Sequence, residues 1–169
     1  MNRIYIVGYM GAGKTTAARR LANRLGWEVY DTDAMLEEKY HISVDDFFHK
    51  YDEPLFRRLE SQILHETEQY DNAVISTGGG TACFFDNMDW MNQNGKTVFL
   101  KISPASAVSR LMVSKKKRPL AKNKTEEELR EYVESHYTSR MPFYDKAQYT
   151  IKAEDLDIDK LVKLLFPQM

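Results

Sequence analysis

The chain has 169 residues, and its 24 lysine and arginine residues against 25 aspartate and glutamate residues give a net charge of −1. This length fits one domain with its own hydrophobic core, and the balanced charge argues against a nucleic-acid binder. The single cysteine, Cys83, excludes an internal disulfide framework and a cysteine-based metal cluster. No apolar run is long enough to span a membrane, and the apolar amino terminus leads directly into the first motif, so we expect no signal peptide. We therefore expect a cytoplasmic monomer that binds neither nucleic acid nor a membrane.

Short apolar runs alternate with amphipathic stretches, which predicts βαβ units and a parallel sheet. The predicted strands are Ile4–Val7, Trp27–Tyr30, Ala73–Ser76, Thr97–Ile102 and Gln148–Ile151. The predicted helices are Lys14–Leu25, Ala34–Tyr40, Val44–His49, Pro54–Glu68, Phe84–Gln93, Pro104–Val113, Glu126–Met141 and Ile158–Leu165. We expect one three-layer α/β/α domain over residues 1–169, built on a central five-stranded parallel sheet.

A glycine-rich motif follows the first predicted strand. Residues 8–15 read G-Y-M-G-A-G-K-T, which matches the P-loop pattern G-x-x-x-x-G-K-[ST] between a strand and a helix. Such a loop closes backbone N–H groups around phosphates at a helix N-terminus. Lys14 would reach the β- and γ-phosphates, and the hydroxyl of Thr15 would ligate Mg²⁺. The alternative is a chance match in a turn, but the flanking strand and helix favour a nucleoside triphosphate site.

Two aspartates, Asp31 and Asp33, follow the second predicted strand, at the sheet edge where open α/β folds bind ligands. Two residues apart in extended chain, their carboxylates point the same way. One can serve Mg²⁺, directly or through water, while the other accepts a substrate hydroxyl and is a candidate base. The alternative is that Asp33 only caps the helix beginning at Ala34, which would leave Asp31 without a role.

Three consecutive glycines, Gly78, Gly79 and Gly80, follow the third predicted strand. Glycines are entropically expensive to order, so they suit a place where a ligand approaches backbone N–H groups closely. The strand ends without the aspartate that other P-loop proteins place near this point for Mg²⁺. This absence assigns the metal to Asp31.

Two arginines are candidates for binding a substrate carboxylate. Arg57 shares a helix face with Glu60, which indicates either a surface ion pair or a glutamate that holds Arg57 for bidentate binding. The motif leaves both alternatives open. A positive charge in the last turn of a helix is favourable in itself, so Arg140 could have a structural role. The alternative is that the proline-aromatic turn after it directs its side chain into the ligand-binding cleft. The histidines lie on separate predicted helices without ligand spacing and are assigned to structural or surface positions: His41, His49, His65 and His136.

The basic stretch 114–124 lies between two predicted helices and is poor in helix-forming residues. It is either a solvated charged loop or a mobile lid that closes on triphosphate charge, and the P-loop favours the lid, at residues 112–124. The stretch lacks the interleaved aromatic residues of a nucleic-acid patch.

Taken together, these motifs resemble the shikimate kinase family, over nearly the whole chain from Gly8 to Tyr144. The resemblance rests on the ordered motifs G-x-x-x-x-G-K-T, D-x-D, F-R-x-x-E, T-G-G-G, R-P-L and R-x-P-x-Y. It implies a P-loop kinase fold with a mobile lid and a helical substrate-binding region at residues 32–70. It also implies ATP-dependent, Mg²⁺-assisted phosphorylation of the 3-hydroxyl of shikimate, a step in making chorismate and the aromatic amino acids.

Matching positions imply the residue roles. Lys14, Asp33 and Arg118 would be catalytic, and Glu60 would support Arg57. Shikimate would be bound by Asp33, Arg57, Gly78, Gly79, Gly80 and Arg140, with both arginines on its carboxylate. ATP would be bound by Gly11, Ala12, Gly13, Lys14, Thr15, Thr16, Arg118 and Arg110, the last of these flanking the adenine. Thr15 and Asp31 would serve Mg²⁺.

Two departures from the family pattern affect loop geometry. Asp52 precedes Glu53 where the family often has glycine, and Ala121 follows R-P-L where a second leucine is usual. The rival functions are another small-molecule P-loop kinase, such as a gluconate kinase, and a non-catalytic nucleotide-binding regulator. Gluconate is also a polyhydroxylated acid, so the residue chemistry alone does not separate it from shikimate.

Overall fold

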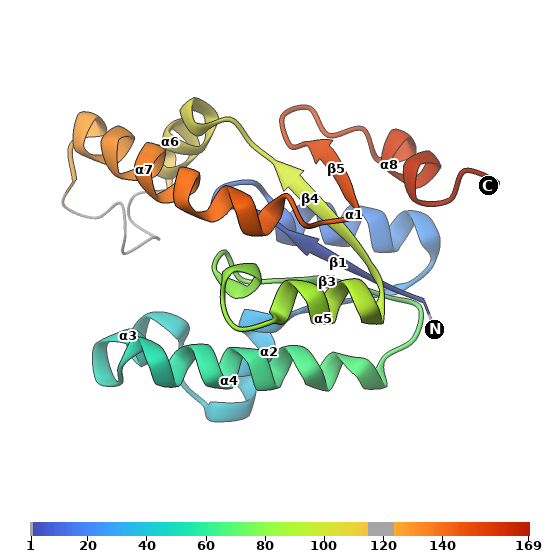
Figure 1. Cartoon of the computed structure of the whole chain (residues 1–169), viewed down its shortest axis with the longest axis horizontal. Helices are drawn as coiled ribbons and strands as arrows, with labels where there is room; N and C mark the ends of the chain where they lie inside the picture. The colour runs from blue at the N-terminus through green and yellow to red at the C-terminus, as the bar shows by residue number, and fades with distance from the viewer. Residues whose placement is uncertain (1, 115–123) are drawn as a thin grey trace.

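Within residues 2–114 and 124–169, which the computed structural model describes, five parallel strands form a sheet in the order β2-β3-β1-β4-β5 (Figure 1). The strands are β1 (Arg3–Val7), β2 (Glu28–Asp31), β3 (Ala73–Ser76), β4 (Lys96–Lys101) and β5 (Tyr149–Lys152). β1 and β3 are buried along their whole length, as expected of apolar strands covered on both faces. The predicted parallel sheet is confirmed, and each strand boundary agrees with the prediction to within one residue.

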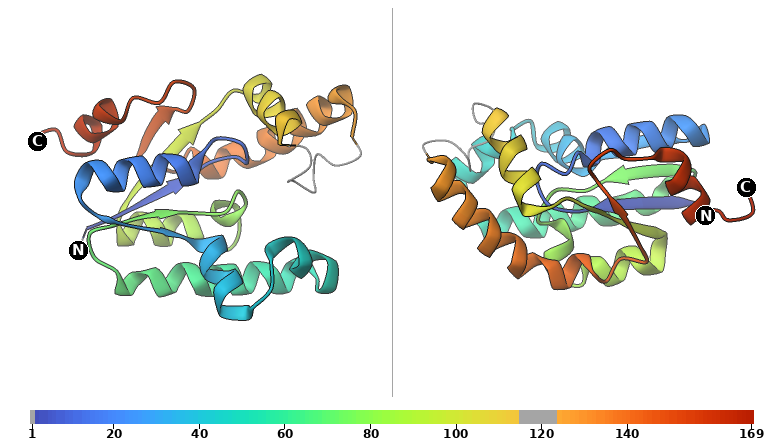
Figure 2. Two further views of the ribbon diagram at one scale, coloured as in Figure 1. Left: turned by 180° about the vertical axis from the view of Figure 1, so that it is seen from behind. Right: turned by 90° about the horizontal axis from the view of Figure 1, so that it is seen from above.

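Helices cover both faces of the sheet and complete three layers (Figure 2). α1 (Lys14–Leu25) and α8 (Ile158–Leu165) lie on one face, and α5 (Asn87–Asn94) and α7 (Glu126–Tyr144) lie on the other. α1 buries Ala17, Ala18 and Leu21, whose spacing places them on one side of the helix. The three-layer α/β/α prediction is confirmed. None of the described helices combines the length and the apolar character needed to cross a membrane.

Three further helices form a group of their own beside β2 and β3, seen at the bottom of Figure 1. They are α2 (Thr32–Tyr40), α3 (Val44–Lys50) and α4 (Glu53–Glu66). They share a second, smaller hydrophobic core, made by Leu36, Phe47, Phe56 and Ile63. These helices coincide with the helical region predicted at residues 32–70. Packing in their own core holds α4, and the side chains that it carries, in place.

Several helix boundaries differ from the prediction for identifiable local reasons. α2 begins at Thr32 rather than Ala34, because the side chain of Asp31 caps it. It ends at Tyr40, as predicted. His41, the next residue, has a left-handed backbone conformation (φ 55°) and so does not lie on a helix, contrary to the assignment of the histidines to helices. α5 begins only at Asn87, since Phe85 is also left-handed (φ 51°) and interrupts the predicted helix. α4 ends at Glu66, where a short 3₁₀ helix, η1 (Thr67–Gln69), follows.

α7 continues through Pro142, although the sequence predicted that the helix would end near Arg140 in a proline-aromatic turn. A proline inside a helix costs about 3 kcal/mol, so other contacts must hold this last turn. Tyr144 supplies them: its ring is fully buried and stacks on Phe99 with a centroid distance of 5.1 Å. Because the helix continues past Pro142, Arg140 lies within α7 and not in a turn after it.

α6 (Pro104–Val113) packs against α7 and carries Arg110 in its last turn. It begins with Ser103, whose hydroxyl accepts a hydrogen bond from the N–H of Ser106. Residues 115–123, and with them most of the predicted lid and Arg118, lie outside the described residues.

Candidate active site

A cavity of about 810 Å³ opens where β1, β2 and β3 end, with α3 and α4 on one side and α7 on the other. We call it the acceptor cavity. Its lining includes Asp33, Arg57, Glu60, the three glycines at 78–80, and Arg140. The structure therefore brings together every residue predicted to bind shikimate, from four separate parts of the chain.

The P-loop, residues 8–15, adjoins this cavity through Met10. Gly11 and Gly13 both have φ of 86°, a region that residues with a side chain rarely adopt, so these positions require glycine. The Lys14 ammonium donates to the carbonyls of Gly8 (2.8 Å) and Tyr9 (3.1 Å). The lysine thus lies folded over its own loop, at the position where phosphate oxygens would compete for it.

Asp31 has two roles, one for each oxygen. Its Oδ1 accepts the N–H groups of Asp33 (2.9 Å) and Ala34 (3.1 Å), so it is Asp31 that caps α2. Its Oδ2 accepts a hydrogen bond of 2.8 Å from the hydroxyl of Thr15. The alternative that Asp33 caps the helix is wrong, which leaves the Asp33 carboxylate available to the cavity. Thr15 and Asp31 together offer two hard oxygen ligands of the type that Mg²⁺ prefers.

Asp33 lies against the glycine triplet. A Cβ at Gly78 would lie 2.9 Å from Asp33 Oδ1 and 3.0 Å from Glu60 Oε2, so only glycine fits between these two carboxylates. Burial, followed by the negative charges of Glu60 and Asp31, raises the pKa of Asp33 to about 7, although Lys14 opposes the shift. A carboxylate that titrates near neutral pH is well matched to accepting a proton from a substrate hydroxyl.

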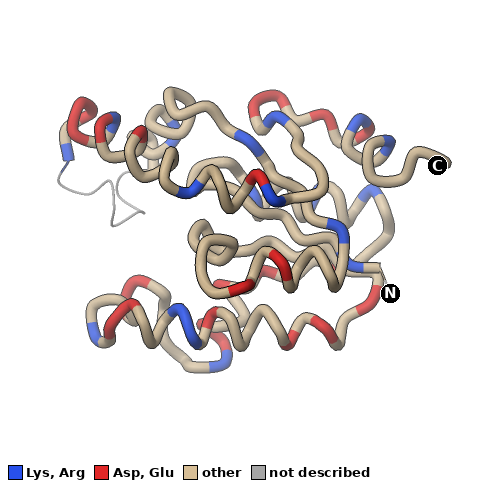
Figure 3. Tube along the Cα trace, viewed as in Figure 1, with Lys and Arg blue, Asp and Glu red and all other residues tan. Residues whose placement is uncertain are grey.

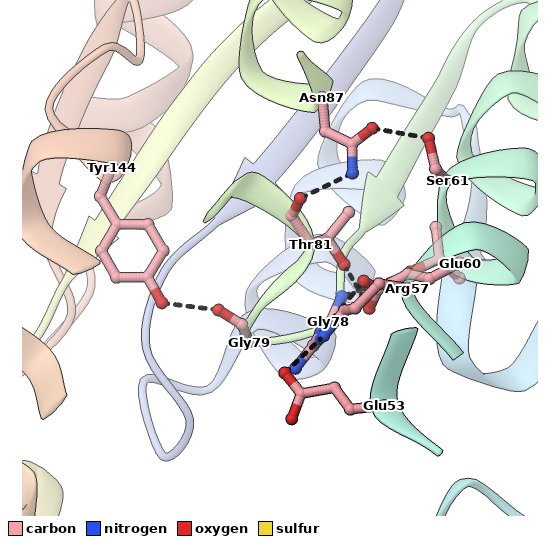
Figure 4. A network of polar contacts seen from close by, with 10 residues as sticks. Glu53, Arg57, Glu60, Ser61, Gly78, Gly79, Thr81, Asn87 and Tyr144 are labelled. Atoms are coloured by element: carbon pink, nitrogen blue, oxygen red, sulfur yellow. Dashed lines mark hydrogen bonds and ion pairs between the residues drawn. The ribbon is translucent and has the colours of Figure 1, made fainter. Parts of the chain in front are cut away.

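Arg57 and Glu60 form the centre of a buried polar network (Figure 4). Arg57 Nη1 donates to Glu60 Oε1 (3.1 Å), and the Thr81 hydroxyl donates to Glu60 Oε2 (2.9 Å). The two residues are only 9% and 2% exposed, so the alternative of a surface ion pair is wrong. The network continues from the Thr81 carbonyl through Asn87 to Ser61 (2.9 and 2.8 Å), which anchors it to α4 and to η2 (Thr81–Cys83).

The Arg57 guanidinium is oriented by more than Glu60. It lies 4.2 Å from the centroid of the Phe84 ring, and its Nε contacts Glu53 at 3.5 Å. That Nε is buried and has no hydrogen-bond partner among the described residues. A buried N–H that has an ion contact but no hydrogen bond, at a cavity wall, is suited to a ligand carboxylate.

Arg140 reaches the same cavity from α7, beside Gly79: a Cβ on that glycine would lie 3.6 Å from Arg140 Nη1. The Tyr144 hydroxyl donates to the Gly79 carbonyl (2.6 Å), so α7 also holds the glycine loop in place. Across residues 2–114 and 124–169, no carboxylate forms an ion pair with Arg140. Two arginines thus face one cavity from opposite walls.

Arg110 lies next to the P-loop. Its Nη1 donates to the carbonyls of Gly11 (3.0 Å) and Ala12 (3.2 Å), so α6 supports the loop directly. Thr16 follows Thr15 in the first turn of α1. Arg118 lies outside the described residues, so its predicted role stays a prediction.

Sequence reasoning missed two cavity residues among the histidines. His49 and His136 both line the acceptor cavity, which the sequence did not indicate. Their assignment to surface or structural positions agrees with the structure, since the His49 side chain is 75% exposed and His136 is hydrogen-bonded to the buried Tyr9. The signal for His136 was its spacing, because Tyr132, His136 and Arg140 lie four residues apart and so share one face of α7.

Comparison with known proteins identifies the family of this chain. The shikimate kinase family model matches residues 10–168. Curated shikimate kinases from Phocaeicola vulgatus and Bacteroides thetaiotaomicron are 45% and 43% identical over 157 residues, which is 93% of this chain and 90% of each relative. The crystal structure of the Bacteroides thetaiotaomicron shikimate kinase superposes with a TM-score of 0.93 at 41% identity, covering 97% of this chain and 98% of that one.

A second solved structure, shikimate kinase from Acinetobacter baumannii in complex with shikimate, has a TM-score of 0.84 at 33% identity and covers 99% of this chain and 94% of that one. The sequence and the fold thus agree with those of the relatives over almost the full length. The chain belongs to the shikimate kinase family.

Proposed function

We propose that this chain transfers the γ-phosphoryl group of ATP to the 3-hydroxyl of shikimate. The observation that carries the proposal is the convergence of Arg57 and Arg140 with Asp33 in one cavity. The two guanidinium groups can bind the carboxylate of an acceptor, and the Asp33 carboxylate can accept hydrogen bonds from its ring hydroxyls. Together these groups fit a small hydroxylated acid. The relative from Acinetobacter baumannii was solved with shikimate, and we carry that ligand over to the acceptor cavity.

The P-loop would hold ATP through the backbone N–H groups of residues 11–16, with Lys14 on the β- and γ-phosphates. For this the Lys14 ammonium exchanges the carbonyls of Gly8 and Tyr9 for phosphate oxygens. Thr15 and Asp31 would hold Mg²⁺, since their oxygens are of the right type and already lie within one hydrogen bond of each other. Bound Mg²⁺ would neutralise phosphate charge. Arg110 would flank the adenine, and Arg118 would add positive charge to the phosphates.

In the transfer step, the 3-hydroxyl oxygen attacks the γ-phosphorus as the bond to the β,γ-bridging oxygen breaks, and ADP leaves. Asp33 accepts the hydroxyl proton, which its pKa of about 7 allows near neutral pH. Lys14 stabilises the charge that develops on the phosphoryl oxygens. Arg57 and Arg140 fix the carboxylate of shikimate, so the ring presents the correct hydroxyl to Asp33. Glu60 keeps Arg57 in this orientation.

We also propose that the chain acts as one domain and as a monomer in the cytoplasm, without nucleic acid or a membrane. The balanced charge supports the absence of a nucleic-acid partner, and Figure 3 shows acidic and basic residues interspersed along α4 and α7.

The test is an assay of ADP release with ATP and Mg²⁺ and with shikimate, gluconate or a nucleoside monophosphate as acceptor. We expect turnover with shikimate and none above the hydrolysis background with the other two. Turnover with gluconate alone would support the rival kinase. Nucleotide binding without turnover of any acceptor would support the regulator.

A further inference from the structure

A fully buried tyrosine of the P-loop is hydrogen-bonded to a histidine of the acceptor cavity. The Tyr9 hydroxyl lies 2.9 Å from His136 Nδ1, and Tyr9 is 0% exposed. The Tyr9 ring stacks on the Tyr137 ring with a centroid distance of 4.7 Å, and it meets the His136 imidazole edge-on with a centroid distance of 5.5 Å. The P-loop pattern leaves the position of Tyr9 variable, so this contact is not a requirement of phosphate binding. It connects the nucleotide side of the site to α7.

The surroundings of Tyr9 determine which imidazole nitrogen carries the proton. Among the described residues, His136 is the hydrogen-bond partner of the Tyr9 hydroxyl. A buried phenol that did not donate to Nδ1 would leave its proton unsatisfied, which is costly. The hydroxyl therefore donates to Nδ1, and the neutral imidazole carries its proton on Nε2. His136 lines the cavity, and since Nδ1 is taken by Tyr9, Nε2–H is the remaining donor of the imidazole for a ligand there.

His136 provides this donor without adding a third positive charge. Burial, followed by the charges of Arg140 and Arg57, lowers the pKa of His136 to about 4, with Glu53 opposing the shift. The ring of Tyr132 also packs against the imidazole, with a centroid distance of 4.9 Å. Burial raises the pKa of Tyr9 far above its usual value, so the phenol keeps the proton that it donates. At neutral pH both side chains are therefore uncharged, and the hydrogen bond between them runs from the Tyr9 hydroxyl to His136 Nδ1.

We propose that His136 Nε2–H is a third donor to the carboxylate of the acceptor, beside Arg57 and Arg140, and that Tyr9 is the positioning residue that holds it. This inference rests on the function proposed above. The carbonyl of Tyr9 also accepts a hydrogen bond from Lys14 (3.1 Å), so one residue contacts both the phosphate-binding lysine and the acceptor-binding histidine. The arrangement links the geometry of the P-loop to that of the carboxylate site.

Two substitutions separate the two nitrogens of His136. His136→Asn retains a polar atom near Nδ1, so it can still bond to Tyr9, but it lacks a donor at Nε2. His136→Gln retains an N–H donor near Nε2. Binding of shikimate and of its methyl ester would be measured by calorimetry, together with the KM for ATP and the melting temperature of each variant.

We expect His136→Asn to weaken shikimate binding about 10-fold and His136→Gln to restore most of it, with the KM for ATP unchanged in both. The methyl ester, which keeps a carbonyl acceptor but lacks the negative charge, should show a smaller difference between wild type and His136→Asn than shikimate does. If His136→Asn binds shikimate like wild type while His136→Gln is weaker, His136 serves only Tyr9 and the inference fails. Wild-type turnover of shikimate would in that case leave the proposed function intact, whereas a wild type that binds no shikimate would overturn both.

The tautomer itself can be measured by ¹⁵N NMR of the imidazole. We expect the Nε2–H form in the wild type and a mixture of both forms in Tyr9→Phe, which keeps the ring packing but loses the hydroxyl. A wild-type imidazole protonated on Nδ1 would contradict the role assigned to Tyr9.

Discussion

The nucleotide side and the acceptor side of this site differ in how their polar groups are held. On the nucleotide side, Lys14 bonds to backbone carbonyls of its own loop and Thr15 bonds to Asp31. In the proposed function, both contacts would be exchanged for phosphate oxygens and Mg²⁺. On the acceptor side, Arg57 and Glu60 are buried and paired within a network that reaches α4 and η2. The acceptor side is therefore organised without its ligand, whereas the proposed function requires the nucleotide side to rearrange on binding.

This difference has a physical cause. A flexible lysine can leave weak backbone contacts at little cost, and the strong charge of a triphosphate drives the exchange. A small monoanionic acceptor offers much less binding energy, so its pocket must be rigid to bind it well. If this comparison holds, changes on the nucleotide side should lower the rate of transfer, and changes in the acceptor network should lower shikimate affinity and stability.

The largest effect should come from Lys14→Met. Loss of this charge from the phosphoryl oxygens should lower kcat by about 10⁴-fold, while shikimate affinity in the absence of nucleotide stays within about twofold. Single-turnover kinetics and calorimetry measure the two quantities. A parallel loss of shikimate affinity would show that the two sides are not separable.

Asp33→Asn should lower kcat by about 10³-fold, because the attacking hydroxyl loses its proton acceptor, and ATP affinity should be unchanged. In the wild type, kcat/KM should rise with pH and level off above about 7, the pKa of Asp33. A pH–rate profile that is flat from 5 to 8 would exclude Asp33 as the base.

Glu60→Gln removes the charge partner of buried Arg57. It should lower the free energy of unfolding by about 3 kcal/mol and weaken shikimate binding about 10-fold, because Arg57 loses its orientation. Glu66→Gln is a matched control, since Glu66 pairs with Lys39 on the surface and should contribute less than about 1 kcal/mol. Equal effects in denaturant titrations would contradict the special role of the network.

The smallest effect concerns stability. The pKa of Asp33 in the folded chain, about 7, lies above its ordinary value of 3.8. The folded state therefore holds this proton more tightly, and stability falls as the pH rises from about 4 to about 7. Asp33→Asn should gain about 1 to 2 kcal/mol over the wild type at pH 8 and nothing at pH 4. Thermal unfolding of Asp33→Asn and of the exposed control Asp86→Asn tests this, and a gain independent of pH would contradict it.

The sequence predicted the strands and the phosphate loop well, because apolar runs and glycine spacing are local signals with direct geometric meaning. It placed the start of α2 two residues late, at Ala34, and left a cap at Asp33 open as an alternative. The cap is Asp31, whose backbone is extended (φ −125°, ψ 121°). It ended α7 too early, at Met141, because the anchoring of Tyr144 to Gly79 joins residues far apart in the chain. His136 was missed for the same reason, since its partner Tyr9 lies 127 positions earlier.

The most direct test of the account is ³¹P NMR of the product formed by the wild type from ATP, Mg²⁺ and shikimate. The account predicts one new phosphate monoester whose phosphorus couples to the ring proton H3 of shikimate, in equal amount to the ADP formed. Inorganic phosphate as the only new species, or an ester on a different hydroxyl, would contradict it.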